Sequence, residues 1–471
     1  MSHKGKYLII SGAVLVILFG VAWLLFLSGD KQEFQLVPRE RAMTDRNSMG
    51  GTEVGTGWSN QAEAAAAVQE AVGLDLRGKT QRHPDFAVLF ASSGSDLPGM
   101  LTAARKILGK KSKIYGGTSD SRAVMTNKGY VGVIDKGDAP PPGKRGLSVM
   151  TVASKDIVFG VGSASFTAYP SAPEAAQAAL FMAIKNAGRS PQDPPQVILI
   201  TLTRGQEEEA LQGIEAVVGK SVLVLGGTTG GPKFAVLGSQ EVFEQGISLA
   251  VIYTALPVGW VFEGGFESID TPSGLVTKMD GKAIVEIDHR PALDVYDEWL
   301  GGGIKKLLSE EDDYSRIRDL LTLHPLCRMY KSLDGRQYIL FSHPWPKDKT
   351  YKDKSILTAT RINQGDKIYL SHGTWEMLLN RITNLPVSAR KQGGLSPDRP
   401  PLLGIGYICA GVMGTMPIVE RERMALLLNQ AHHGAPFIAA FTWGEQGHLP
   451  GIGAKHGNLL TSFLVIGEKA K

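Results

Sequence analysis

The chain repeats part of its own sequence after about 110 residues, and this repeat limits the folds open to it more than any other feature. The apolar run at 88–90 recurs at 198–200, and Ile-Tyr-Gly-Gly-Thr-Ser at 114–119 recurs as Val-Leu-Gly-Gly-Thr-Thr at 224–229. In both copies a proline precedes the apolar run, and a Ser- or Thr-containing loop and a helical segment follow it. The pattern predicts two copies of one strand–helix–strand unit.

Both copies begin and end alike. Each begins with an Ala-rich helix, after Trp58 in the first copy and after Tyr169 in the second. Each is predicted to end in a β-hairpin, made by 146–149 with 156–161 and by 246–249 with 258–262.

A fainter third copy is predicted at the C-terminus. Its expected elements are helices at 374–389 and 420–432 and strands at 404–410, 436–442 and 459–466. The block 259–371 before it has hairpin turns such as Asp280-Gly281 and is expected to be mostly β, with a helix at 292–300. The predicted fold class is therefore α/β, with mixed β-sheets flanked by helices and built from repeated strand-helix-strand-hairpin units.

An uncharged segment precedes these copies. From Tyr7 to Leu27 there are 21 residues without a charge, which as a helix span about 31 Å and match the core of a bilayer. The run is longer than the apolar region of a cleaved signal peptide. We therefore predict a tail at 1–6, a transmembrane anchor at 7–27 and a tether at 28–52.

Basic residues flank this segment on both sides, so their number does not set its orientation. A tail of only six residues favours retention of the N-terminus in the cytoplasm. The predicted location is the cell membrane, as a single-pass protein whose soluble portion is extracytoplasmic (periplasmic).

Composition excludes several classes of protein. With 43% hydrophobic and 20% charged residues the chain is expected to form folded cores. A net charge of +4 from 50 basic and 46 acidic residues predicts no nucleic-acid partner. Two cysteines, Cys327 and Cys409, exclude a disulfide scaffold and CxxC metal sites but leave one disulfide open.

The two Gly-Gly-Thr segments are the first candidate ligand site. They are predicted as turns at strand ends, where ligands gather in α/β sheets, and successive N–H groups there can form a nest for an anion. The alternative is that the glycines only let the chain turn between packed layers. The candidate residues are Gly116, Gly117, Thr118, Ser119, Gly226, Gly227, Thr228 and Thr229.

The third copy supplies a second set of candidates, Trp443, Gly444 and Glu445, in a segment expected to be a Gly/Pro-rich loop. A carboxylate there can receive a ligand ammonium group while Trp443 stacks on it. If the copies pack alike, Thr118, Thr228 and Glu445 converge on one rim, and Glu445→Gln is expected to weaken binding about tenfold to hundredfold.

Metal binding and catalysis are not expected. Glu445, His448 and His456 could form a metal site, but their spacing does not place them on one helix face, so no metal is predicted. No catalytic motif is found, and the chain is not expected to be an enzyme.

Across roughly 53–467 the chain resembles the FIST sensory domains. The N-terminal resemblance rests on Val-Gly-Thr-Gly-Trp-Ser at 54–59, Leu-Phe-Ala-Ser-Ser at 89–93 and Gly-Gly-Thr-Ser at 116–119. The C-terminal one rests on Ala-Leu-Asp-Val-Tyr at 292–296, Ile-Asn-Gln-Gly-Asp at 362–366, Ile-Cys-Ala-Gly at 408–411 and Gly-Glu at 444–445. It implies a FIST N-terminal domain at 53–255, with copies at 53–163 and 164–255, and a FIST C-terminal domain at 256–471.

The resemblance also implies a function. FIST domains bind small ligands, amino acids among them, so the expected partners are a small molecule and a separate signalling protein, and Cys409 joins the ligand-binding candidates. Val412 stands where family members often carry a basic residue. No cofactor is expected, but some members resemble haem proteins that sense nitric oxide, so a haem-binding gas sensor is one alternative. A scaffold protein without a small ligand is the other alternative to a small-ligand sensor.

Overall fold

A computed structural model of the chain describes residues 48–49, 51–76, 83–120, 123–132, 146–268, 270–309, 314–348 and 350–468. All of them belong to one compact unit, Asn47–Lys471. In this part of the chain, no helix combines the length and apolar character needed to cross a bilayer. The predicted anchor at 7–27 lies outside the described residues.

The first of four sheets has the order β1-β2-β7-β3-β4-β11-β12. Its strands are β1 (Ser48–Met49), β2 (Thr52–Ser59), β3 (Phe86–Ser92), β4 (Lys113–Ser119), β7 (Leu147–Ser154), β11 (Val236–Leu237) and β12 (Val242–Phe243). Helices α2 (Ala64–Leu76) and α3 (Leu97–Leu108) pack on it. Asp96 caps α3 by accepting a hydrogen bond from the Gly99 amide.

The second sheet has the order β26-β25-β10-β9-β13-β8. Its strands are β8 (Ile157–Ser165), β9 (Val197–Leu202), β10 (Leu223–Thr228), β13 (Gly246–Thr254), β25 (Gly444–Leu449) and β26 (Gly453–Gly457). Helices α4 (Ala172–Asn186) and α5 (Glu207–Val218) pack on it, and the short helix η1 (Phe166–Ala168) follows β8.

The third sheet has the order β14-β27-β23-β24-β5-β6. Its strands are β14 (Val258–Glu263), β27 (Thr461–Ile466), β23 (Leu403–Cys409), β24 (Phe437–Thr442), β5 (Ala123–Thr126) and β6 (Gly129–Gly132). Its helices are α9 (Trp375–Gln392), α10 (Ala410–Thr415) and α11 (Ile418–Ala431).

These three sheets share one strand order. Each contains a parallel pair (β3/β4, β9/β10 or β23/β24) flanked on one side by two antiparallel strands. The outer partner of the second parallel strand comes from elsewhere in the chain, since β11 pairs with β4, β25 with β10 and β5 with β24. Each sheet therefore holds a strand of another segment, and the three are interlocked.

The predicted closing hairpins are wrong. β7 pairs with β2 and β3, whereas β8 pairs with β13 in the second sheet, and likewise β14 pairs with β27 in the third. The second strand of each expected hairpin is the first strand of the next sheet. The physical reason is that β7 has both of its edges paired, one with β2 and the other with β3, so neither edge is left for β8.

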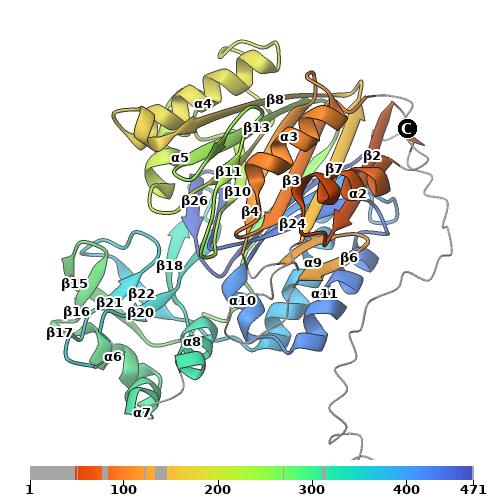
Figure 1. The fold of residues 1–471 in the computed structure, drawn as a ribbon. Helices are drawn as coiled ribbons and strands as arrows, with labels where there is room; N and C mark the ends of the chain where they lie inside the picture. Colours follow the sequence, from red (N-terminus) through yellow and green to blue (C-terminus); the bar gives the residue numbers. More distant parts are fainter. Residues whose placement is uncertain are drawn as a thin grey trace, which may run out of the picture. The chain divides into compact units, whose positions relative to one another are not determined.

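Helices cover one face of each sheet, and the other faces meet in a common core (Figure 1). In that core Phe86 stacks on Phe159 with ring centroids 4.4 Å apart, and Phe90 meets Tyr407 at 5.8 Å. Residues of all three sheets thus share one apolar interior, which makes strands such as β3 and β9 buried along their whole length.

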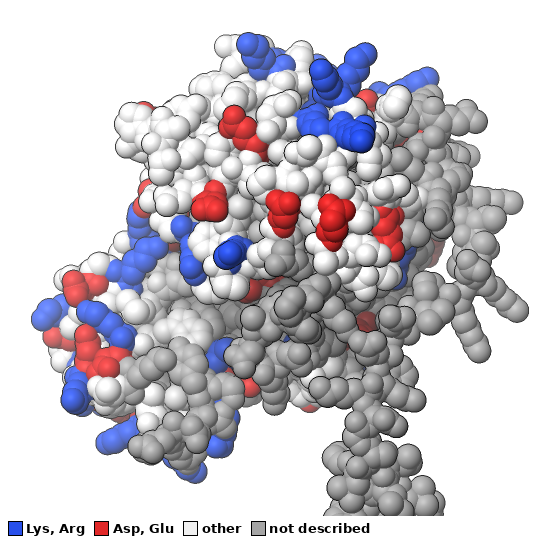
Figure 2. Space-filling view, in the orientation of Figure 1, with Lys and Arg blue, Asp and Glu red and all other residues white. Residues whose placement is uncertain are grey.

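A fourth sheet fills the block between β14 and α9, with the order β19-β18-β22-β15-β16-β21-β20 and β17 beside β16. Its strands are β15 (Ser273–Asp280), β16 (Ala283–Ile287), β17 (Arg290–Pro291), β18 (Leu326–Lys331), β19 (Gln337–Ser342), β20 (Pro344–Pro346), β21 (Ile356–Thr358) and β22 (Lys367–Leu370). The expected helix at 292–300 is confirmed as α6 (Ala292–Trp299), while α7 (Gly303–Ser309) and α8 (Tyr314–Leu323) were not expected. Over this block, Lys and Arg are mixed with Asp and Glu on the face shown in Figure 2.

Candidate functional site

The parallel strand pairs of the three sheets end at one place. The Phe441 amide donates to Ser119 Oγ at 2.8 Å, and the Asp120 amide donates to the Phe441 carbonyl at 2.8 Å. The Trp443 amide donates to the Thr228 carbonyl at 3.0 Å. We call the residues just after these strands, Asp120, Arg204 and Trp443, the three-sheet rim.

The structure brings the two Gly-Gly-Thr segments and the Gly444-Glu445 segment together. Gly227 lies opposite Glu445, and Thr228 opposite Gly444, in the β10–β25 ladder. A Cβ on Gly117 would lie 3.1 Å from Thr229 Cγ2, so the first segment adjoins the second.

The glycine segments are strands, and the prediction that they are turns is wrong. Gly116 lies inside β4, between Leu89 of β3 and Leu237 of β11, and has φ of 149°. A Cβ there would overlap the Leu89 carbonyl oxygen, and one on Gly226 would overlap that of Ile200. The glycines therefore permit close approach between strands, and the ladder takes up backbone groups that a nest would need.

Three buried hydroxyl groups, one from each sheet, meet below the rim. Tyr115 Oη lies 2.7 Å from Thr201 Oγ1 and 2.6 Å from Tyr407 Oη. Burial raises the pKa of both tyrosines well above the ordinary value, so their phenols stay protonated. Sequence analysis missed this contact, because nothing in an apolar strand indicates which strand of another sheet it will face.

Glu445 is fully buried in β25, so the prediction that it occupies a rim loop is wrong. The segment is a strand because it pairs with β10 and with β26. Glu445 Oε1 accepts from Thr442 Oγ1 at 2.8 Å, and Oε2 accepts from the Leu460 amide at 3.2 Å. Burial raises the pKa of Glu445 well above its usual value, although hydrogen bonds from Thr442, Leu460 and Cys409 oppose the shift.

Cys409 ends β23 beside this carboxyl group and is buried. Burial raises the pKa of its thiol, and the charge of Glu445 raises it further. A thiol of this kind is a poor nucleophile. Cys327 is also buried, and both cysteines are free, so the structure contains no Cys327–Cys409 disulfide.

The Glu445 environment predicts a dependence of stability on pH. The folded state keeps the Glu445 proton above pH 4.5, where the unfolded state releases it, so the free energy of unfolding falls as pH rises. Relative to Glu445→Gln, which has no such proton, the wild type is expected to lose up to about 1.4 kcal/mol per pH unit as pH rises from 4.5 toward the raised pKa of folded Glu445. Urea unfolding of both proteins across this range measures the difference, and parallel profiles would contradict it.

Trp443 is the exposed centre of the rim, with 45% of its surface accessible. Its Nε1–H donates to the Asp120 carboxylate, and the Arg204 guanidinium lies 4.7 Å from its ring centroid and 4.6 Å from that of Phe234. No carboxylate among the described residues forms an ion pair with Arg204. The rim thus joins a cation, an indole and an anion, one from each sheet.

Sequence analysis found Trp443 but missed Arg204 and Asp120. The available signal was position, since Arg204 comes two residues after β9 and Asp120 comes directly after β4. Side chains at such strand ends commonly face ligands.

The side chains of Glu445 and His448 have different neighbours. Glu445 contacts Thr442 and Leu460, whereas His448 lies against Trp260 with ring centroids 6.1 Å apart. Among the described residues, the group with metal-ligand spacing is instead Glu207, Glu208 and His456.

Two of the buried imidazoles pack against aromatic rings. His432 lies between Phe437 and Phe463, with ring centroids 5.8 and 5.7 Å away. His343 packs against Trp345 at 4.5 Å. Burial lowers the pKa of each to about 3, so both imidazoles are neutral at pH 7.

Family comparisons match most of the chain. A model of the FIST N domain matches residues 85–290, and a model of the FIST C domain matches residues 292–448. No curated protein sequence matches.

Similar solved structures include cyanuric acid hydrolase from A. caulinodans, at 6% identity and a TM-score of 0.35, covering 89% of this chain and 100% of that one. PurLQS from Thermotoga maritima is similar at 11% identity and a TM-score of 0.21, covering 89% of this chain and 73% of that one. TM-scores this low support no conclusion about fold or function.

Proposed function

This chain belongs to the FIST family, and from that premise we propose that its three-sheet rim binds a small zwitterionic ligand, such as an amino acid, and signals through a separate protein. FIST domains are small-ligand sensory domains of signalling proteins. In this proposal Arg204 receives the ligand carboxylate, Asp120 receives its ammonium group and Trp443 packs between them.

The observation that carries the proposal is that the Arg204 guanidinium is exposed and has no carboxylate partner among the described residues. An exposed guanidinium held over two aromatic rings, with no carboxylate partner among the described residues, has its donors available to an anion. Asp120 accepts a hydrogen bond from Nε1–H at the edge of the same indole, so a ligand with both charges can contact Arg204 and Asp120 beside Trp443.

Glu445 has no direct part in this binding, because it is fully buried in β25 and its two oxygens accept hydrogen bonds from Thr442 and Leu460. We therefore expect Glu445→Gln to change ligand affinity little, in place of the tenfold to hundredfold loss expected for a carboxylate at the rim. The glycine segments and Cys409 act by packing the strands beneath the rim.

The proposed signalling depends on the three rim residues belonging to different sheets. Asp120, Arg204 and Trp443 belong to three different sheets, so a ligand that contacts all three changes the stability of the sheets against one another. A separate protein that binds one arrangement of the sheets would read that change. The rim is proposed to bind its ligand without converting it.

A thermal-shift screen of the full chain with amino acids and small anions tests the proposal. A ligand present at one hundred times its Kd stabilises the folded state by about 2.7 kcal/mol. A rise in Tm with an amino acid, but not with ligands that lack either charge, is expected. No rise with any member of the panel would favour the scaffold alternative.

We propose further that residues 7–27 anchor the chain and that the following portion is extracytoplasmic. The supporting observation is the uncharged run of 21 residues. Protease added to cells with a permeable outer envelope but an intact cytoplasmic membrane is expected to digest residues 53–471. Digestion only after the cytoplasmic membrane is broken would contradict the orientation.

A further inference from the structure

A second polar cluster lies behind the rim, where helix α5 meets β26. One carboxylate oxygen each of Glu207 and Glu208 and one ring nitrogen of His456 lie within 4.8 Å of one another. Glu207 and His456 are buried, and Glu208 is half-buried. We propose that Glu207, Glu208 and His456 bind a divalent transition-metal ion, with Zn²⁺ as the representative ion.

The donor set suits such an ion. Two carboxylates and one imidazole are ligands that Zn²⁺ accepts, and three protein ligands leave a position for water. Ligand atoms around a tetrahedral zinc lie roughly 3.4 Å apart, given bond lengths of about 2.1 Å. Small side-chain rotations would therefore close a cluster whose atoms already lie within 4.8 Å.

Acidic residues at this position also have a simpler explanation. Glu207, Glu208 and Glu209 occupy the first turn of α5, where negative side chains stabilise a helix without any ion. Glu209 also needs no metal ion, because it forms an ion pair with Arg361. The explanation does not account for His456, or for the buried amide that lies against it.

That amide, Gln446, is the second observation. It is fully buried, and its Oε1 has no hydrogen-bond partner. Its Nε2 lies 2.9 Å from His456 Nδ1 and 2.9 Å from Thr228 Oγ1, and Thr228 Oγ1 donates to Glu207 Oε1 at 3.4 Å. The amide with the unsatisfied oxygen therefore contacts His456 directly and Glu207 through Thr228.

Turning the Gln446 amide over would place Oε1 against His456 Nδ1 and Thr228 Oγ1, and would move Nε2 to the position where Oε1 has no partner. Oε1 would then accept an Nδ1–H, which leaves the Nε2 lone pair of His456 for the ion. Metal-bound histidines commonly have their other ring nitrogen held in this way. Gly444 allows the arrangement, since a Cβ there would overlap His456 Cε1.

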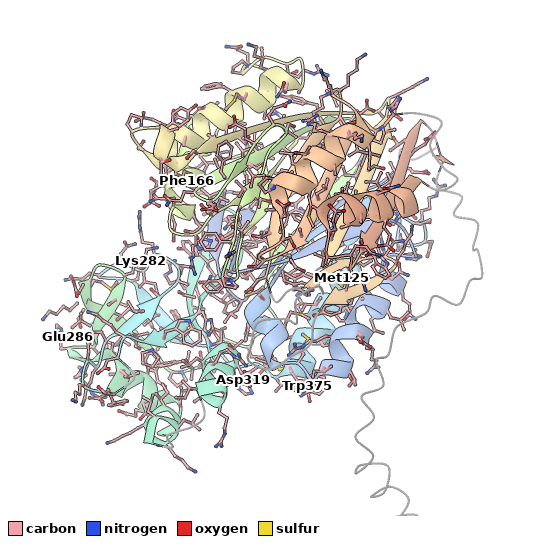
Figure 3. All side chains as sticks on the ribbon, viewed as in Figure 1. Met125, Phe166, Lys282, Glu286, Asp319 and Trp375 are labelled. Carbon is pink, nitrogen blue, oxygen red and sulfur yellow. The ribbon has the colours of Figure 1, made fainter. Side chains whose placement is uncertain are left out.

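A backbone amide of the fourth-sheet block holds one of the proposed ligands in place. The Arg361 amide donates to Glu208 Oε1 at 2.7 Å. This contact places the cluster beside the fourth sheet. Lys282, labelled in Figure 3, lies in the turn between β15 and β16 of that sheet.

Isothermal titration of the full, metal-free chain with ZnCl₂ tests the proposal, with Co²⁺ absorption as a readout of coordination. We expect binding of one Zn²⁺ per chain at this site, at least about tenfold weaker in Glu208→Gln and in His456→Gln, with loss of the visible Co²⁺ bands. Gln446→Met, which removes only the positioning group, should weaken binding by about tenfold or more.

Three matched controls separate this site from others. Glu209→Gln removes the neighbouring carboxylate on the same turn, and His448→Gln removes a nearby imidazole of β25. His372→Gln breaks the His324–His372 pair, whose nitrogens lie 3.1 Å apart and could also hold zinc. Each control should retain the affinity for the site and its Co²⁺ spectrum.

Circular dichroism of the metal-free variants shows whether each is folded, and the half-buried Glu208 gives a variant that should fold normally. The proposal is overturned if the wild type binds no Zn²⁺. It is also overturned if folded Glu208→Gln binds as tightly as the wild type, or if His372→Gln alone abolishes binding.

Discussion

Gly116→Ala is expected to lower the free energy of unfolding by about 3–5 kcal/mol. The new Cβ would overlap the Leu89 carbonyl oxygen, which is a backbone atom and cannot rotate away. Alanine is also strained at the φ of 149° that Gly116 adopts. Because β4 contributes to the common core of three sheets, a shift of this strand disturbs their contacts. Urea denaturation followed by circular dichroism measures the change.

Gly73→Ala is the matched control. Gly73 lies in helix α2, and no atom lies within 4 Å of a Cβ built on it. Alanine there should raise stability by about 0.5–1 kcal/mol, because glycine loses more backbone freedom on folding. Similar small effects of both substitutions would show that Gly116 is not needed for strand approach.

Arg204→Gln is expected to weaken ligand binding about tenfold to hundredfold, with little change in stability. The substitution removes a charge-assisted hydrogen bond to the ligand carboxylate, worth about 1.5–3 kcal/mol. The exposed guanidinium contacts only ring faces among the described residues, so the fold loses about 0.5–1 kcal/mol at most. Isothermal titration with the best ligand from the thermal-shift screen measures the affinity.

Arg189→Gln controls for the loss of an exposed, stacked arginine. The Arg189 guanidinium lies 5.2 Å from the Tyr253 ring centroid, and Arg189 pairs with Asp193, away from the rim. Its affinity for the ligand should match that of the wild type. An equal loss in both variants would indicate a general effect of charge and not a contact at the rim.

Many strands could be predicted from sequence, but their partners could not. The third-copy strands expected at 404–410 and 436–442 appear as β23 (Leu403–Cys409) and β24 (Phe437–Thr442), because apolar runs bounded by Gly and Pro indicate strands directly. The same runs carry no information on pairing, so β8 was assigned to a hairpin with β7. The antiparallel partners of β4, β10 and β24 come from distant segments, which no local pattern reveals.

The strands β25 and β26 were missed for a different reason. Gly-Glu-Gln-Gly-His-Leu in β25 lacks the apolar pattern of a buried strand, yet every residue of it is buried. Thr442 hydrogen-bonds Glu445, and Thr228 and His456 hydrogen-bond the Gln446 amide nitrogen, so these contacts take the place of some apolar ones. Arg204 and Asp120 were missed because the rim exists only once three sheets have packed.

The most direct test of the rim compares an amino acid ligand with its amide, which lacks the carboxylate charge, in wild type and in Arg204→Gln. Four titrations give the coupling between that carboxylate and Arg204. The amide is predicted to bind wild type at least about tenfold more weakly than the amino acid, and both should bind Arg204→Gln with similar affinity. If the amino acid keeps the same advantage over its amide in Arg204→Gln, Arg204 does not bind the carboxylate and the rim site is wrong.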